Sequence, residues 1–186
     1  MNRAAAVIVL AAGAGTRMKS ETPKVLHPLA GRTLLGHAMT AAWDLEPELV
    51  TVVVRHEKEK VAAHARALDP EVLIAEQDEI PGTGRAVWCA LQAISGAGRD
   101  LAGPLVVIAG DTPLLDGATL RELLDAHVHD QNAVTVLTAE VDDATGYGRI
   151  VRDEDGLVAS IVEHRDATPA QLAITEINTS TYVFDA

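Results

Sequence analysis

Cysteine and aromatic residues are scarce in this chain of 186 residues. Five residues are aromatic, and Cys89 is the single cysteine. A core with so few rings must be built from Val, Leu, Ile and Ala, a composition typical of a buried parallel sheet covered by helices. One cysteine excludes an internal disulfide and any zinc site made of several cysteines. We therefore expect a protein of the reducing cytoplasm.

Positive charge is also in deficit, because 15 Lys and Arg residues face 27 Asp and Glu residues, giving a formal net charge of −12. This balance argues against nucleic acid or an anionic membrane as the main partner. No apolar run approaches the length of a membrane span. The apolar first ten residues lack the basic start and cleavage site of a signal peptide. A small phosphate ligand remains compatible, since it needs only local donors.

Apolar strand patterns alternate with helical patterns over most of the chain. The predicted strands span residues 4–10, 49–54, 72–75, 105–109 and 133–139, and the predicted helices span 33–45, 58–68, 83–94 and a segment after residue 114. We predict Thr83 as the N-cap of the third helix, and Thr119 with Glu122 as the capping box of the fourth.

Strand patterns dominate after residue 140. Residues 149–152 and 157–163 flank a predicted hairpin turn at 153–156, and a last strand covers 174–184. The alternation before it predicts an α/β fold: a Rossmann-like mixed, mainly parallel sheet with helices on both faces. The length suits one domain over residues 1–186. Because the chain stops two residues after Phe184, at a strand, we expect the domain to continue beyond it.

Three unusual segments follow predicted strands, at residues 10–24, 77–83 and 110–114. In open parallel sheets, ligands bind at the carboxyl ends of the strands. We therefore predict that the three segments converge on one ligand-binding cleft.

The first segment combines glycines with cations. Gly13 and Gly15 allow backbone N–H groups to approach phosphate oxygens. Arg17 and Lys24 are candidate donors to a polyphosphate. The segment has no Gly-Lys-Ser/Thr ending, which excludes a P-loop, and Met18 stands where the dinucleotide fingerprint needs a small residue. A plain glycine turn is the alternative, which the two cations disfavour.

The other two segments supply polar groups for a base and a metal. The amide of Gln77 offers both a donor and an acceptor to a base edge. Gly82 and Thr83 stand at a predicted helix start, where polar ligands bind. Asp111 follows a strand, where a carboxylate can hold Mg²⁺. Two alternatives remain open here: a surface glutamine before a capped helix, and an aspartate used in a turn.

Together these motifs resemble those of the bacterial N-acetylglucosamine-1-phosphate uridylyltransferases. Those are the N-terminal domains of bifunctional enzymes that also carry glucosamine-1-phosphate acetyltransferase activity. The glycine segment alone is shared by many sugar and alcohol-phosphate nucleotidyltransferases, whereas three later motifs point to this family. The matching segments are residues 10–18 with 24–27, 82–84, 110–114, 146–150, 162–167 and 176–179.

The resemblance implies a fold of the nucleotide-diphospho-sugar transferase type. It implies transfer of UMP from UTP to N-acetylglucosamine 1-phosphate, giving UDP-N-acetylglucosamine and pyrophosphate for cell-wall precursor synthesis, with Mg²⁺ as cofactor. The implied site residues are Leu10, Ala11, Ala12 and Gly13 for the nucleotide, Gln77, Gly82 and Thr83 for uracil, Ala109 and Gly110 for ribose, Asp111 for Mg²⁺, Gly146, Glu163 and Asn178 for N-acetylglucosamine, and Arg17 and Lys24 as catalytic groups on the phosphates.

The chain departs from the family pattern in two respects. Arg85 stands where relatives often have His. The family's second Mg²⁺ ligand, an Asn, and its acetyltransferase β-helix lie beyond residue 186; the resemblance implies that the full-length protein is a homotrimer through that domain. Two functional alternatives stay open: another sugar or alcohol-phosphate nucleotidyltransferase, and a nucleotide-binding fragment without turnover.

Overall fold

The computed structural model describes residues 2–15 and 18–185. The chain forms two compact units, which are described here one at a time. The first unit comprises residues 1–135 and 182–186, and the second comprises residues 136–181. The chain passes from one unit to the other within β7 (Val134–Glu140) and again within β10 (Glu176–Asp185).

A parallel sheet forms the centre of the first unit. Its strands lie in the order β5 (Leu73–Glu76), β4 (Val50–Val54), β1 (Ala6–Leu10) and β6 (Pro104–Ala109). The last residues of β10 pair antiparallel with β6. All of β4 and the first four residues of β1 are buried, as expected for strands covered on both faces.

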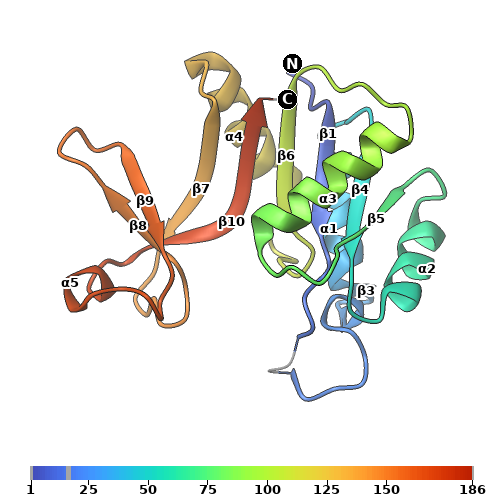
Figure 1. Ribbon diagram of the computed structural model, residues 1–186, viewed down its shortest axis with the longest axis horizontal. Coiled ribbons are helices and arrows are strands. Elements are labelled where there is room, and N and C mark those ends of the chain that lie inside the picture. The colour runs from blue at the N-terminus through green and yellow to red at the C-terminus, as the bar shows by residue number, and fades with distance from the viewer. Residues whose placement is uncertain (1, 16–17, 186) are drawn as a thin grey trace. The chain divides into compact units, whose positions relative to one another are not determined.

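Helices cover both faces of this sheet. Figure 1 shows α3 in front of β1 and β4, and α1 behind them. On the α3 face, Ile8 and Val53 of the strands pack with Ala86 and Ala90 of the helix. The predicted fold class is therefore confirmed. The helices are α1 (Leu34–Trp43), α2 (Lys58–Leu68), α3 (Thr83–Gly96) and α4 (Gly117–Asp130).

Two predicted helix caps are wrong. The N-cap of α3 is Gly82, with a φ of 120° that only glycine adopts without strain, so Thr83 is the first helical residue. The N-cap of α4 is Asp116, whose carboxylate accepts from the backbone N–H of Thr119 at 2.8 Å. That hydrogen bond lowers the pKa of Asp116. Because Asp116 caps α4 three residues earlier, Thr119 and Glu122 form no capping box.

Four short elements have no counterpart in the predicted pattern. A 3₁₀ turn covers Lys24–Leu26, and a small hairpin joins β2 (Pro28–Leu29) to β3 (Arg32–Thr33). In the second unit, the one-turn helix α5 (Pro169–Leu172) has a capping box of Thr168 and Gln171. Two-residue strands and single turns leave no periodicity in the sequence.

The second unit is built around an antiparallel hairpin of β8 (Arg149–Arg152) and β9 (Val158–Val162). The predicted turn between them is confirmed: the carboxylate of Asp153 accepts from the backbone of Leu157 at 2.8 Å. The first half of β10 pairs antiparallel with β8. Within the described ranges of both units, no helix is long and apolar enough to span a bilayer.

Truncation of one leucine tests the layer behind the sheet. Helix α4 contacts α1 and β6, and its Leu124 is fully buried. We expect Leu124→Ala to lower the free energy of unfolding, measured in urea, by roughly 2–5 kcal/mol, because the removed methyl groups leave a cavity. Val128→Ala, one turn further along α4 at a side chain that is 37% exposed, is the control. Equal losses from the two variants would contradict this packing.

Candidate functional site

Three strand-end segments are joined by backbone hydrogen bonds at one edge of the first unit's sheet. Gly110 N–H donates to Leu10 O at 2.8 Å, and Ala11 N–H donates to Val53 O at 2.8 Å. Gln77 N–H donates to the end of β4, at Val54 O, at 2.9 Å. Strand β1 lies between β4 and β6, so this edge is the point where the strand order reverses and where open α/β sheets bind ligands.

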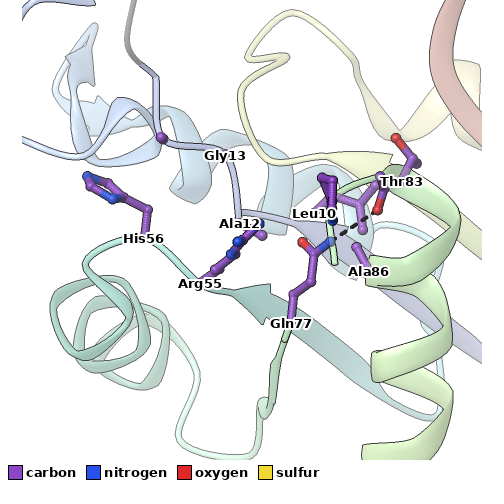
Figure 2. Close-up of a pocket in the computed structure, with 11 residues that line it drawn as sticks. Leu10, Ala12, Gly13, Arg55, His56, Gln77, Thr83 and Ala86 are labelled. Atoms are coloured by element: carbon purple, nitrogen blue, oxygen red, sulfur yellow. Dashed lines mark hydrogen bonds between the residues drawn. The ribbon is translucent and has the colours of Figure 1, made fainter. Parts of the chain in front are cut away.

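The larger of two cavities at this edge has a volume of about 730 Å³. Figure 2 shows its lining side chains, which come from the ends of β1, β4 and β5 and from the start of α3. The structure thus brings six predicted site residues together. They are Leu10, Ala12, Gly13, Gln77, Gly82 and Thr83.

The orientation of the Gln77 amide in this cavity is set by its neighbours. Its Nε2 donates to Ile80 O at 2.9 Å and to Gly82 O at 3.1 Å. Only the NH₂ end of an amide can donate to two carbonyls. The Oε1 atom is therefore turned away from the hydrogen bond drawn in Figure 2, and it is left as an acceptor.

The smaller cavity has a volume of about 290 Å³ and adjoins the larger one, because Leu10 and Gly13 line both. Lys24 and Asp111 also line it, and their side chains form an ion pair between Nζ and Oδ2. Both side chains are partly exposed, at 34% and 27%. A cation and a carboxylate from different loops therefore meet at one accessible point.

Gly15 makes the approach of Lys24 possible. Its φ of 60° lies in the left-handed region, and a Cβ on it would stand 2.6 Å from the Cβ of Lys24. Any side chain at this position would push Lys24 away from the smaller cavity. Arg17, the other predicted cation of this segment, lies outside the described residues.

The residues of the smaller cavity fit a Mg²⁺ ion that a nucleotide brings with it. In the described part of the chain, no three His, Cys, Asp or Glu side chains gather in a way that could hold a metal. Mg²⁺ is commonly bound by one or two carboxylates together with substrate phosphates. Asp111 provides one such carboxylate beside open volume.

Three other predicted residues shape the strand ends and line neither cavity. Ala11 is buried at 2% exposure. Ala109 pairs in register with Leu10 at the end of β6. A Cβ on Gly110 would stand 3.0 Å from the Leu10 carbonyl oxygen, so the two strand-end loops pack closely there.

The predicted sugar-binding residues lie in the second unit. A Cβ on the buried Gly148 would stand 3.6 Å from Glu163 Oε1 and 3.7 Å from Asn178 Cβ. Asn178 N–H also donates to Gly148 O at 2.9 Å, and Gly146 lies two residues before Gly148. Glu163 and Asn178 therefore both lie close to the backbone of Gly148, which has no side chain.

Two polar residues that line the larger cavity, Arg55 and His56, lie outside the three predicted segments. Both follow directly on β4, so the strand-end rule that selected the other segments would have found them. Arg55 Nη2 donates to Glu79 O at 3.0 Å. This bond ties the end of β4 to the loop before α3.

Comparisons with known proteins agree with this geometry. The sequence matches the model of a family described as "MobA-like NTP transferase domain" over residues 7–174. The bifunctional protein GlmU of Pseudarthrobacter chlorophenolicus is 58% identical over 182 residues, and that of Streptomyces avermitilis is 57% identical over 184. Each alignment covers 98% of this chain but only 37% and 38% of the relative. The chain thus spans little more than a third of the length of these curated relatives.

A solved structure shows the same fold. The crystal structure of HddC from Yersinia pseudotuberculosis complexed with GMP-PN has a TM-score of 0.72 and 24% identity, over 97% of this chain and 76% of that one. At that identity the likeness concerns the fold alone.

A single methyl group tests the contact between Gly15 and Lys24. We expect Gly15→Ala to lower the free energy of unfolding by more than the roughly 1–2 kcal/mol that left-handed backbone costs an L-residue, because its Cβ also collides with Lys24. Gly98→Ala is the matched control, since Gly98 has a φ of 70° and nothing within 4 Å of its Cβ position. Equal losses in urea unfolding would show that Lys24 does not approach Gly15 this closely.

Proposed function

We propose, since the chain belongs to the family of MobA-like NTP transferase domains, that it transfers UMP from UTP to N-acetylglucosamine 1-phosphate. The products are UDP-N-acetylglucosamine and pyrophosphate. The observation that carries this proposal is the Lys24–Asp111 pair in a cavity adjoining the one that contains the Gln77 amide. The similarity to bifunctional protein GlmU along 98% of the chain supports the choice of substrates. We also propose that residues 1–186 belong to one nucleotidyltransferase domain.

In this proposal the larger cavity holds uracil. The free Oε1 of Gln77 is an acceptor for the N3–H of uracil, whereas the N3 of cytosine carries no hydrogen. A site built to accept from N3–H disfavours a base that lacks this donor, because the acceptor would stay unpaired once the bound base covers it. We assign the same base to Gly82 and Thr83 at the start of α3. We assign the ribose to Ala109 and Gly110.

The phosphates occupy the smaller cavity in this proposal. The acceptor is already a phosphate anion, so one of its oxygens attacks the α-phosphorus of UTP without a general base. The bond from this phosphorus to the β-phosphate breaks, and pyrophosphate leaves from the opposite side with the bonding electrons. Catalysis then consists of alignment and neutralisation of charge.

Lys24 and Arg17 supply the protein's positive charge for this step. Lys24 donates to the reacting phosphate groups, and its approach to Asp111 supports that position. We assign Arg17 to the β- and γ-phosphates. Gly13 and Gly15 let backbone N–H groups approach the phosphate oxygens. Mg²⁺ bound at Asp111 adds further neutralisation of the phosphate charge.

We assign the N-acetylglucosamine moiety to Gly146, Glu163 and Asn178 of the second unit. A carboxylate and an amide suit sugar hydroxyls and an acetamide group, since they offer acceptors and a donor. Their approach to the bare backbone of Gly148 supports the assignment. We also propose a cytoplasmic protein, without nucleic-acid or membrane partners, whose full-length form is a homotrimer.

Pyrophosphate release tests the function directly. We expect the chain, mixed with Mg²⁺, UTP and N-acetylglucosamine 1-phosphate, to release pyrophosphate faster than with CTP or GTP, or with glucose 1-phosphate as acceptor. Calorimetric titration with UTP and UDP-N-acetylglucosamine gives a second measurement that needs no turnover. Preference for another nucleotide or sugar would instead assign the same chemistry to a different nucleotidyltransferase. Binding without release would identify a nucleotide-binding fragment.

Removal of one cation tests the phosphate site. We expect Lys24→Ala to lower kcat by roughly 10²–10³-fold, the usual effect of losing one preorganised donor to transition-state charge. Lys19→Ala, on the exposed part of the same loop, is the control and should keep the wild-type kcat. A Lys24→Ala variant with unchanged kcat would remove Lys24 from the mechanism.

A further inference from the structure

The loop between β5 and α3, residues 77–82, is closed by an ion pair. We call it the amide loop, because it carries Gln77. Arg85, in the first turn of α3, donates from Nε to both carboxylate oxygens of Asp78, at 3.1 and 3.0 Å. Its Nη2 also pairs with Asp78 Oδ2. Contacts of this multidentate kind fix the relative orientation of the two groups as well as their distance.

The arginine is held from a second side by Trp88. The guanidinium Cζ lies 4.0 Å from the centroid of the Trp88 ring, one turn further along α3. Stacking on an aromatic face restricts the rotamers of an arginine. Arg85 therefore presents its donors to Asp78 from a constrained position.

The pair itself is partly exposed, with side chains at 28% for Arg85 and 43% for Asp78. Ion pairs at such exposure contribute little to the stability of a protein. The hydrogen bond from Arg85 lowers the pKa of Asp78, with a further contribution from the N–H of Ile80. The carboxylate is therefore ionised at neutral pH, and the pair can act on the conformation of the loop.

A continuous series of contacts leads from this pair to Gln77. Asp78 Oδ1 accepts from the backbone N–H of Ile80 at 3.1 Å. The carbonyls of Ile80 and Gly82, in turn, accept from Gln77 Nε2 at 2.9 and 3.1 Å. The position of Asp78 thus affects the position of the carbonyls that accept from Gln77. Those carbonyls determine which end of the Gln77 amide faces the cavity.

We propose that the Arg85–Asp78 pair determines base specificity by holding the amide loop so that Gln77 presents Oε1 to the base. Arg85 is then a positioning residue for uracil, acting through Asp78. The inference rests on the proposed function. An amide turned by 180° presents its NH₂ group instead, which suits the N3 acceptor of cytosine. Release of the loop makes both orientations accessible, so discrimination between UTP and CTP falls.

Nucleotide titration of four variants tests this role. The dissociation constants for UTP and CTP are measured by calorimetry with Mg²⁺ for Arg85→Ala, Asp78→Ala, Arg85→Lys and the charge-swapped double variant Asp78→Arg with Arg85→Asp. In each alanine variant we expect the ratio of the dissociation constants for CTP and UTP to fall by about tenfold, which is the value of one well-placed hydrogen bond. Arg85→Lys should lose less, and the swap should restore part of the preference.

Arg152→Ala is the matched control. It breaks another arginine–carboxylate pair with two contacts, Arg152 with Glu176 at 2.8 and 2.6 Å, in the second unit. This variant should keep the wild-type preference. Arg85→Lys, which retains one charged contact, also serves if Arg85→Ala fails to fold.

The side-chain NH₂ protons of Gln77 give a readout that needs no nucleotide. By NMR on the free chain, we expect their exchange with water to be slow in the wild type and faster in Arg85→Ala. A wild type that prefers UTP, with alanine variants that keep this preference, overturns the inference alone. A wild type with no preference for uridine nucleotides contradicts the proposed function, and the specificity role falls with it even if the exchange data show the loop to be held.

Discussion

The parallel pairing of β1 with its two neighbours is the constraint on which the cleft depends. Its register places Leu10 opposite Val53 of β4 and Ala109 of β6, so the loops that leave these strands emerge at one edge. Leu10 consequently lines both cavities. A slip of one residue in this register would turn the buried side chains of β1 to the opposite face and separate the loops. The register of β1 therefore determines both the packing of the core and the geometry of the site.

Cations stand at the cleft although the chain as a whole is acidic. The net charge of −12 repels anions at a distance, yet Lys24 and Arg55 line the cavities at the strand ends. Each of them is held by a partner from another segment, Lys24 by Asp111 and Arg55 by the carbonyl of Glu79. Donors fixed in this way need no ordering before they bind an anion, so the phosphate site that we propose is compatible with an acidic chain.

The sequence predicted the repeated features of the fold better than the singular ones. Long apolar strands and the helix at Lys58–Leu68 were predicted because their periodicity extends over whole elements. The hairpin β2–β3 was missed because two-residue strands have no period. The cap of α3 was misplaced by one residue because the choice of Gly82 over Thr83 depends on a φ of 120°, which composition does not reveal. Most of the cavity lining comes from the predicted strand-end segments; Arg55 follows β4 directly, and no glycine there marks the position in the sequence.

By itself, the sequence determined the α/β class, the alternation of elements and the segments that carry glycines, cations and carboxylates at strand ends. These are local properties, set by patterns a few residues long. The tertiary structure decided which of these groups meet: Lys24 with Asp111, Glu163 and Asn178 around Gly148, and Arg85 with Asp78. It also decided which end of the Gln77 amide is left for a ligand. Contacts of this kind join residues from different elements, so they depend on sheet register and helix packing, which no local pattern contains.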